Sequence, residues 1–159
     1  MGNNATQPLC CRKNPKGDVN GDIVTKGDFK YHNAIGRGGF GKVLKVEKDG
    51  VMYAMKEMLK ARVMAKKSVE SVMKELELMC RIDSEFIVNV QWAFHDKDYL
   101  YLVMDLMMGG DLRYHHARIR KFTHTQTQFF IACLVDALEA VHMEGIIHRD
   151  IKPENLVFD

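Results

Sequence analysis

The dipeptide Asp49-Gly50 separates two strand-like segments and constrains the fold more than any other feature of the sequence. An Asp-Gly pair between such segments is a strong signal for a tight β-hairpin. The segments 42–47 and 51–57 are therefore expected to pair as antiparallel neighbours. A third strand-like segment, 29–35, precedes them, so the first three elements predict an antiparallel meander.

The segments that follow add one helix and two strands to this meander. Residues 67–81 carry apolar side chains at helical spacing with charged residues between them, which predicts an amphipathic helix. Two more strands are expected at 88–94 and 99–104, with a turn at 96–98. The sequence thus predicts an α+β fold that begins with a small lobe, a five-stranded antiparallel sheet plus one main helix.

The last third of the chain is predicted to be mainly helical. A short helix is expected from Asp111, and the longest helix spans about 125–144. Thr123, followed three residues later by Gln126, fits a capping box at its start. Gly145 lies where a left-handed cap is expected at its end.

These elements divide the chain into three predicted parts. Residues 1–26 are polar, show no periodicity and are expected to form a flexible tail. Residues 27–107 form the small lobe and a hinge. Residues 108–159 form part of a larger helical lobe.

Composition excludes several classes of protein. A net charge of +2, without a basic stripe, argues against nucleic-acid binding. The sequence shows neither an apolar run of about eighteen residues nor a secretory signal. The spacing of the cysteines fits neither a disulfide framework nor a zinc site, which indicates a reduced, cytoplasmic compartment. These residues are Cys10, Cys11, Cys80 and Cys133.

Three glycines at 36, 38 and 41 form a Gly-x-Gly-x-x-Gly motif, which is weak when taken alone. Dinucleotide-binding proteins use the same spacing, but there the motif opens a helix. Here a strand-like segment follows, so the glycines are expected at the tip of a hairpin. Glycines at such a tip allow backbone N–H groups to approach phosphate oxygens. A hairpin turn without a ligand is an equally good interpretation of this motif in isolation.

Lys56 ends an otherwise apolar strand, where an ammonium group is costly to bury without a partner. Phosphate oxygens or a carboxylate on the following helix would provide that partner. Glu75 is one candidate, but Glu70 and Glu77 lie on the same helix. The alternative is that the Lys56 side chain extends into solvent.

The string His148-Arg149-Asp150-Ile151-Lys152-Pro153-Glu154-Asn155 places polar groups between two short apolar runs. A carboxylate, an ammonium group and an amide are the groups that phosphoryl transfer needs. They orient a hydroxyl nucleophile, contact the transferred phosphate and bind a metal ion. The alternative is a surface turn without a function, which would have this composition only by chance.

These three motifs, in this order and spacing, resemble the protein kinase family of the serine/threonine type over roughly residues 28–159. The resemblance implies that Lys56 holds two ATP phosphates and pairs with Glu75. It also implies that a larger set of residues binds ATP: Ile35, Gly36, Arg37, Gly38, Gly39, Phe40, Gly41, Val43, Ala54, Met104, Asp105, Met107, Asp111 and Val157.

The same resemblance assigns the chemistry to the polar loop. Asp150 would orient the substrate hydroxyl and accept its proton, and Lys152 would contact the γ-phosphate. Asn155 would bind one Mg²⁺. The implied cofactors are ATP and Mg²⁺, and the implied partners are proteins phosphorylated on Ser or Thr.

Within the family, the segment 106–115 is AGC-like and is particularly similar to the myristoylatable YANK branch. Asp111 and Glu154 match positions that favour basic residues in AGC substrates, so a preference for Arg or Lys near the target hydroxyl is expected. The Asp-Phe-Gly segment that supplies the main Mg²⁺ ligand does not occur up to Asp159. Negligible phosphate transfer is therefore expected from these 159 residues alone.

The first residues fit the pattern for N-myristoylation at Gly2, and Cys10 and Cys11 could accept palmitate. Two lipid signals would anchor the chain stably to the cytosolic face of a membrane. One alternative is an unmodified tail. Another is that the protein is a membrane-tethered scaffold. The rival to catalysis is a module that binds nucleotide or a partner without phosphate transfer, although such a module would not need Asp150.

Overall fold

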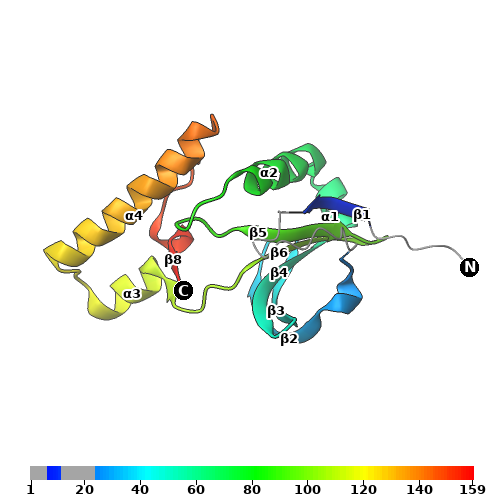
Figure 1. Ribbon diagram of the computed structural model, residues 1–159, viewed down its shortest axis with the longest axis horizontal. Coiled ribbons are helices and arrows are strands. Elements are labelled where there is room, and N and C mark those ends of the chain that lie inside the picture. Colours follow the sequence, from blue (N-terminus) through cyan, green and yellow to red (C-terminus); the bar gives the residue numbers. More distant parts are fainter. Residues whose placement is uncertain (1–6, 12–23) are drawn as a thin grey trace, which may run out of the picture. The chain divides into compact units, whose positions relative to one another are not determined.

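The computed structural model describes residues 7–11 and 24–159 (Figure 1). The acylation site predicted at Gly2 lies outside the described residues. The chain divides into two compact units, and each is described separately. Among the described residues, the first unit comprises those up to Cys80 with Asn89–Leu106, and the second comprises Arg81–Val88 with Met107–Asp159.

The first unit is built on an antiparallel sheet with the strand order β1-β5-β6-β4-β3-β2. The five predicted strands are confirmed as neighbours in this sheet. A further strand, β1, was not predicted and pairs with the edge of β5. The strands are β1 (Gln7–Cys11), β2 (Lys30–Arg37), β3 (Gly41–Lys48), β4 (Val51–Leu59), β5 (Val90–His95) and β6 (Tyr99–Asp105).

The predicted hairpin turn at Asp49-Gly50 is confirmed. The two residues have φ angles of 52° and 78°, and the flanking Lys48 and Val51 are paired across the turn. Positive φ at both central residues is the signature of the type I′ turn, whose twist matches that of the strands. The turn thus sets the register of β3 against β4.

Two helices follow β4, where one was predicted. The short α1 (Lys60–Ala65) was missed, because six residues are too few to show a helical period. The main helix α2 (Val69–Arg81) begins two residues later than expected. Lys67 explains this late start, because its φ of 52° is incompatible with a continuous helix.

Both faces of the sheet are packed, which is why its strands are largely apolar. One cluster includes α1 and α2 residues and consists of Met58, Val63, Val72, Leu76, Val90, Ala93 and Leu102. The other cluster consists of Phe29, Leu44, Val46, Met55, Phe94, Tyr101 and Val103. Each fully buried large side chain contributes about 1.5–3 kcal/mol relative to exposure.

Before β2, a short 3₁₀ helix, η1 (Lys26–Asp28), precedes Phe29.

The second unit contains α3 (Leu112–Ile119) and the long α4 (His124–Met143). The capping box of Thr123 and Gln126 is confirmed at the start of α4. At its end Gly145 has a φ of 71°, and its N–H and that of Ile146 donate to the carbonyls of His142 and Val141. This is a Schellman motif, the left-handed ending expected of a glycine in this place.

A small two-stranded sheet and a 3₁₀ helix complete the second unit. Strand β7 (Gly110–Asp111) pairs with β8 (Val157–Phe158), and η2 (Pro153–Asn155) lies just before β8. The polar loop therefore lies between α4 and strand β8. Strand β8 pairs with β7, which directly precedes α3. On α4, four large apolar side chains are more than half exposed: Phe129, Ile131, Val135 and Met143.

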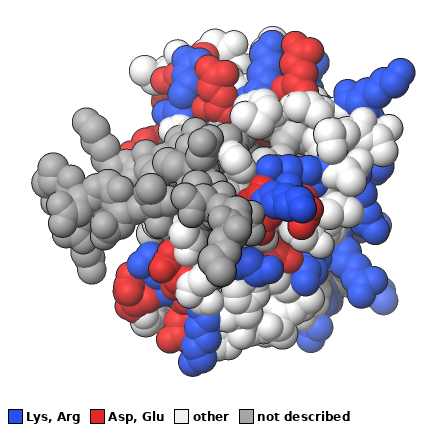
Figure 2. All heavy atoms as spheres, turned by 90° about the vertical axis from the view of Figure 1, so that its right-hand side faces the viewer, with Lys and Arg blue, Asp and Glu red and all other residues white. Residues whose placement is uncertain are grey.

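In the described part of the chain, every helix is too short or too polar to span a bilayer. Figure 2 shows Lys and Arg side chains interspersed with Asp and Glu side chains on the face that it presents. Charges of both signs therefore share this face.

Candidate active site

The glycine motif forms the tip of the β2–β3 hairpin. The N–H of Gly38 donates to the carbonyl of Gly41 at 2.9 Å, and the N–H of Gly41 donates back at 3.3 Å. Gly39 and Phe40 are the two residues of the turn between them. Because β3 begins at Gly41, a strand rather than a helix follows the motif. The geometry is therefore not that of a dinucleotide fingerprint.

The two carbonyl groups of this turn are both occupied by protein donors. The carbonyl of Phe40 accepts from the N–H of Leu59 at 3.2 Å, and that of Gly39 accepts from Lys66 Nζ at 3.1 Å. Among the described residues, neither the N–H of Gly39 nor that of Phe40 has a hydrogen-bond acceptor. Adjacent unpaired N–H groups of this kind suit the oxygens of a phosphate.

The glycines of the motif have different structural reasons to be glycine. A Cβ on Gly41 would lie 1.8 Å from the backbone oxygen of Glu57, so β4 itself excludes a side chain there. A Cβ on Gly38 would meet nothing within 4 Å. Gly36 is intermediate, because its Cβ would make ordinary contact with Val43 at 3.6 Å. Gly41 is thus required by sheet packing, whereas Gly38 leaves open space.

Lys56 lies on β4, directly opposite Val43 on β3 and Leu102 on β6. Its Nζ lies 3.7 Å from Oε1 of Glu75 on α2, the pair that the resemblance implies. Both side chains are partly exposed, at 31% and 54%, so this ion pair contributes little to stability. Lys56 is left with a weakly held ammonium group.

Several of the residues implied to bind ATP lie on strands β2, β4 and β6 of the first unit. Ala54 is directly opposite Met104, and paired side chains of neighbouring strands share a face. Ala54 is buried and Met104 half-buried, whereas Ile35 is 46% exposed on β2. Arg37, the last residue of β2, is also exposed.

Asp105, one of the residues implied to bind ATP, has a structural role that sequence reasoning missed. Its carboxylate accepts hydrogen bonds from the N–H of Asn89 at 3.1 Å and from Nε2 of Gln91 at 2.7 Å. These bonds anchor the start of β5 to the end of β6. Met107 lies two residues after Asp105. It is the first residue of Met107–Asp159, one of the two segments of the second unit.

In the second unit the polar loop places three of the predicted residues in direct contact. Lys152 Nζ donates to both carboxylate oxygens of Asp150, at 2.9 and 2.8 Å. Asn155 Nδ2 donates to the carbonyl of Asp150 at 2.8 Å and to Oδ2 at 2.9 Å. The Asp150 N–H donates to His148 Nδ1 at 3.3 Å. Hydrogen bonds at its backbone and at its carboxylate thus orient Asp150.

These contacts shift the ionisation of the pair in opposite directions. The hydrogen bond from Lys152, followed by that from Asn155, holds the pKa of Asp150 below its usual value. The hydrogen bond to Asp150 raises the pKa of Lys152. The stability that Asp150 contributes through this contact is lost as pH falls through its lowered pKa. The stability that Lys152 contributes is lost as pH rises through its raised pKa. Between these limits both groups stay charged.

We expect replacement of Lys152 by Met to raise the pKa of Asp150 toward its ordinary value, because the main stabilising hydrogen bonds are removed. Carboxyl ¹³C chemical shifts followed by NMR across the acid range measure this directly. Lys121→Met is the matched control, since Lys121 is also exposed in the second unit. An Asp150 titration midpoint unchanged by Lys152→Met would show that the contact does not persist in solution.

Asn155 has one side-chain atom suited to a cation. Both of its side-chain hydrogen bonds use the amide nitrogen, so Oδ1 remains as an oxygen ligand of the kind that Mg²⁺ prefers. Over residues 24–159 no three His, Cys, Asp or Glu side chains gather as a metal site. The described residues therefore fit Mg²⁺ through a single amide oxygen.

Two further residues of the set implied to bind ATP lie on the small β7–β8 sheet. Asp111 is the N-cap of α3, and its Oδ1 accepts from the N–H of Tyr114 at 2.7 Å. Val157 pairs with Asp111 and is 43% exposed. Nearby, Arg113 Nη1 lies 2.8 Å from Oε1 of Glu154, a contact that sequence reasoning missed.

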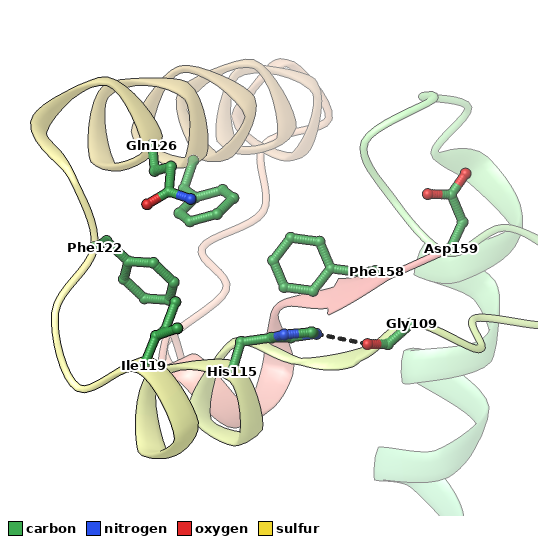
Figure 3. Close-up of a pocket in the computed structure, with 8 residues that line it drawn as sticks. Gly109, His115, Ile119, Phe122, Gln126, Phe158 and Asp159 are labelled. Atoms are coloured by element: carbon green, nitrogen blue, oxygen red, sulfur yellow. Dashed lines mark hydrogen bonds between the residues drawn. The ribbon is translucent and has the colours of Figure 1, made fainter.

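A separate, apolar hollow of about 290 Å³ lies within the second unit (Figure 3). His115 Nε2 contacts the carbonyl of Gly109 at 2.6 Å at its rim. None of the predicted catalytic residues contributes to this hollow, so it is distinct from the polar loop. Its lining consists of Gly109, His115, Ile119, Phe122, Gln126, Phe130, Phe158 and Asp159.

Comparison with known proteins agrees with these motifs. The model of the protein kinase domain matches residues 29–159. "Protein kinase 2" of Dictyostelium discoideum is 39% identical over 142 residues, covering 88% of this chain and 30% of that protein. Human "Serine/threonine-protein kinase 32B" is 41% identical, covering 82% of this chain and 32% of that protein.

A fungal relative shows the same pattern. "Serine/threonine-protein kinase CBK1" of Pneumocystis carinii is 40% identical, covering 83% of this chain and 26% of that protein. The chain thus spans about a third or less of the length of these three relatives, at 30%, 32% and 26%. With the glycine hairpin, the Lys56–Glu75 pair and the Asp150 loop in place, the chain belongs to the protein kinase family.

Proposed function

We propose that this chain is the nucleotide-binding and catalytic-loop part of a serine/threonine protein kinase, which transfers the γ-phosphate of ATP to a Ser or Thr hydroxyl of a protein. The observation that carries the proposal is the Asp150 carboxylate, held by hydrogen bonds from both Lys152 and Asn155. A binding module without catalysis would have no need of so well oriented a carboxylate.

The proposed step balances as a simple transfer. The substrate hydroxyl oxygen forms a bond to the γ-phosphorus, the bond from that phosphorus to the β–γ bridging oxygen breaks, and ADP leaves. Asp150 takes the hydroxyl proton, and its lowered pKa keeps it ionised before the reaction. Lys152, whose ammonium group contacts Asp150 in the structure, would move toward the transferred phosphate.

The first unit would bind the nucleotide. The unpaired N–H groups of Gly39 and Phe40 would contact phosphate oxygens, and Lys56 would add a positive charge. The protein kinase family uses ATP with Mg²⁺. Mg²⁺ neutralises phosphate charge when bound, and Asn155 Oδ1 is the described atom that would hold it.

Nucleotide binding by this chain tests the proposal. We expect Lys56→Met to weaken ATP binding about 10-fold to 150-fold, because the variant loses a charge-assisted contact worth about 1.5–3 kcal/mol. Isothermal titration calorimetry with ATP and Mg²⁺ measures the change. Lys45→Met on β3 is the matched control for loss of a lysine from the same sheet. ATP binding that is absent in the wild type, or independent of Lys56, would contradict the proposal.

Activity of the 159 residues alone is proposed to be negligible, since the Asp-Phe-Gly metal segment does not occur among them. Robust phosphorylation of peptides by the purified 159-residue chain would overturn this.

We also propose an AGC-like kinase close to the YANK branch, with a preference for basic residues near the target hydroxyl. Two acidic side chains support it: Glu154 within the polar loop, and Asp111 on the strand that pairs with β8. Because Arg113 already pairs with Glu154 at 2.8 Å, a substrate arginine would have to displace it. An arrayed peptide screen with the full-length product that shows no basic preference would reject the idea.

The proposed location is the cytoplasm, on the cytosolic face of a membrane if Gly2, Cys10 and Cys11 are acylated. Support comes from the sequence pattern and from the need for two lipid signals in stable anchoring. Mass spectrometry of the native N-terminus decides this, and an unmodified Gly2 would remove the membrane from the proposal.

A further inference from the structure

Lys66, just beyond the end of α1, contacts the tip of the glycine hairpin in two ways. Its Nζ donates to the carbonyl of Gly39 at 3.1 Å, and the same atom lies 5.1 Å from the centre of the Phe40 ring. The second distance is within the range of a cation–π interaction. A Cβ on Gly39 would lie 3.3 Å from Nζ, which shows how closely the ammonium group approaches the turn.

The backbone at Lys66 is itself held in place. Its N–H donates to the carbonyl of Arg62 at 3.1 Å, and the N–H of Lys67 donates to Met64 at 2.9 Å. Val63 of α1 is buried in the cluster that joins the helices to the sheet. Lys66 therefore projects from an anchored helix end toward a turn on a different hairpin.

The contact determines which way the tip N–H groups can point. In a trans peptide the C=O and the following N–H point in opposite directions, and the described chain has no cis peptide bonds. Holding the Gly39 carbonyl toward Lys66 therefore directs the Phe40 N–H away from α1. The Phe40 carbonyl is fixed in the same manner by Leu59 at 3.2 Å. The tip thus keeps its acceptors bound and leaves its donors free.

We propose that Lys66 is a positioning residue for nucleotide binding, which holds the glycine turn in the conformation that presents its N–H groups to the phosphates of ATP. This inference rests on the proposed function, because it assumes that the glycine turn binds phosphate. Lys66 acts through the Gly39–Phe40 peptide. It therefore reduces the conformational freedom that phosphate binding would otherwise remove.

The variants that test this are Lys66→Met, Lys66→Arg and Lys67→Met. Met keeps the aliphatic length and removes the donor, whereas Arg restores a cation that can donate to a carbonyl and stack on an aromatic ring. Lys67 is the matched control, since it is exposed and one residue further along the same connection. Urea unfolding of each variant confirms that the fold is intact.

Calorimetric titration with ATP and with adenosine separates positioning of the phosphates from general damage. We expect Lys66→Met to weaken ATP binding about threefold to fivefold and to leave adenosine binding unchanged, because one hydrogen bond to the turn is lost. Lys66→Arg should bind ATP nearly as the wild type does, and so should Lys67→Met. In addition, ¹⁵N relaxation of the nucleotide-free chain should show greater mobility of Gly39 and Phe40 in Lys66→Met.

The outcomes distinguish this inference from the proposed function. If the wild type binds ATP through Lys56 but Lys66→Met binds as tightly as Lys67→Met, only the role of Lys66 is overturned. The same holds if adenosine and ATP lose affinity equally, or if the mobility of the turn is unchanged. If the wild type does not bind ATP, both the proposed function and the role of Lys66 are overturned.

Discussion

Replacing Asp150 by Asn is expected to lower the rate of phosphate transfer by about 10²–10⁴-fold, the range that a positioned general base contributes. Asn has nearly the same shape as Asp but cannot accept the proton of the substrate hydroxyl. It also cannot hold the Lys152 ammonium group between two negative oxygens, as the carboxylate does at 2.9 and 2.8 Å. The loss should appear in kcat, with little change in the KM for ATP.

The assay uses the full-length product of the transcript that encodes this chain, with ATP, Mg²⁺ and a peptide substrate. Asp136→Asn is the matched control, since Asp136 is an exposed acid on α4 in the same unit. A variant at Asp150 that keeps more than a tenth of the wild-type rate would show that another group accepts the proton. A transcript that stops after Asp159 would instead favour a binding module without phosphate transfer.

Gly41→Ala is expected to destabilise the first unit by about 3 kcal/mol, near the upper end of typical overpacking costs. The new Cβ would lie 1.8 Å from the backbone oxygen of Glu57 and 2.9 Å from its carbonyl carbon. Both Glu57 atoms belong to the backbone of β4, which is paired with β3. The two strands would therefore have to separate to relieve the clash. No side-chain rotation can remove the clash.

Urea unfolding monitored by tryptophan fluorescence measures this change, because Trp92 packs against the core of the first unit. Gly38→Ala is the matched control from the same motif, since a Cβ there meets nothing within 4 Å. We expect its unfolding midpoint to stay close to that of the wild type. Equal midpoints for the two variants would mean that β3 and β4 are further apart in solution than in the structure.

Short-range features of the fold could be read from the sequence because their information lies within a few residues. Asp49-Gly50 specifies its turn through the backbone freedom of two residues. Thr123 and Gln126 specify the start of α4 through their own hydrogen bonds. The glycine hairpin and the composition of the Asp150 loop are local in the same sense, which is why the three motifs together identified the family.

Contacts between distant segments could not be read in this manner. Helix position alone did not select Glu75 over Glu70 and Glu77, and the structure shows which carboxylate lies 3.7 Å from Lys56. The strand β1 was missed because its partner, β5, lies some eighty residues later, from Val90 to His95. Pairing at such a separation depends on the edge that the sheet leaves open.

Sequence information was enough for the order of the five main strands and the long helices, for the turns and caps, for the family and for the chemical groups of the catalytic loop, but not for β1 and α1. Tertiary structure alone decided that Gly41 is required by β4 and that Lys66 reaches the Gly39 carbonyl. It also decided that the Glu154 carboxylate is already paired with the Arg113 guanidinium group. The physical reason is range: caps and turns depend on neighbours in the chain, whereas packing and ion pairs depend on which segments the folded core brings within a few ångströms.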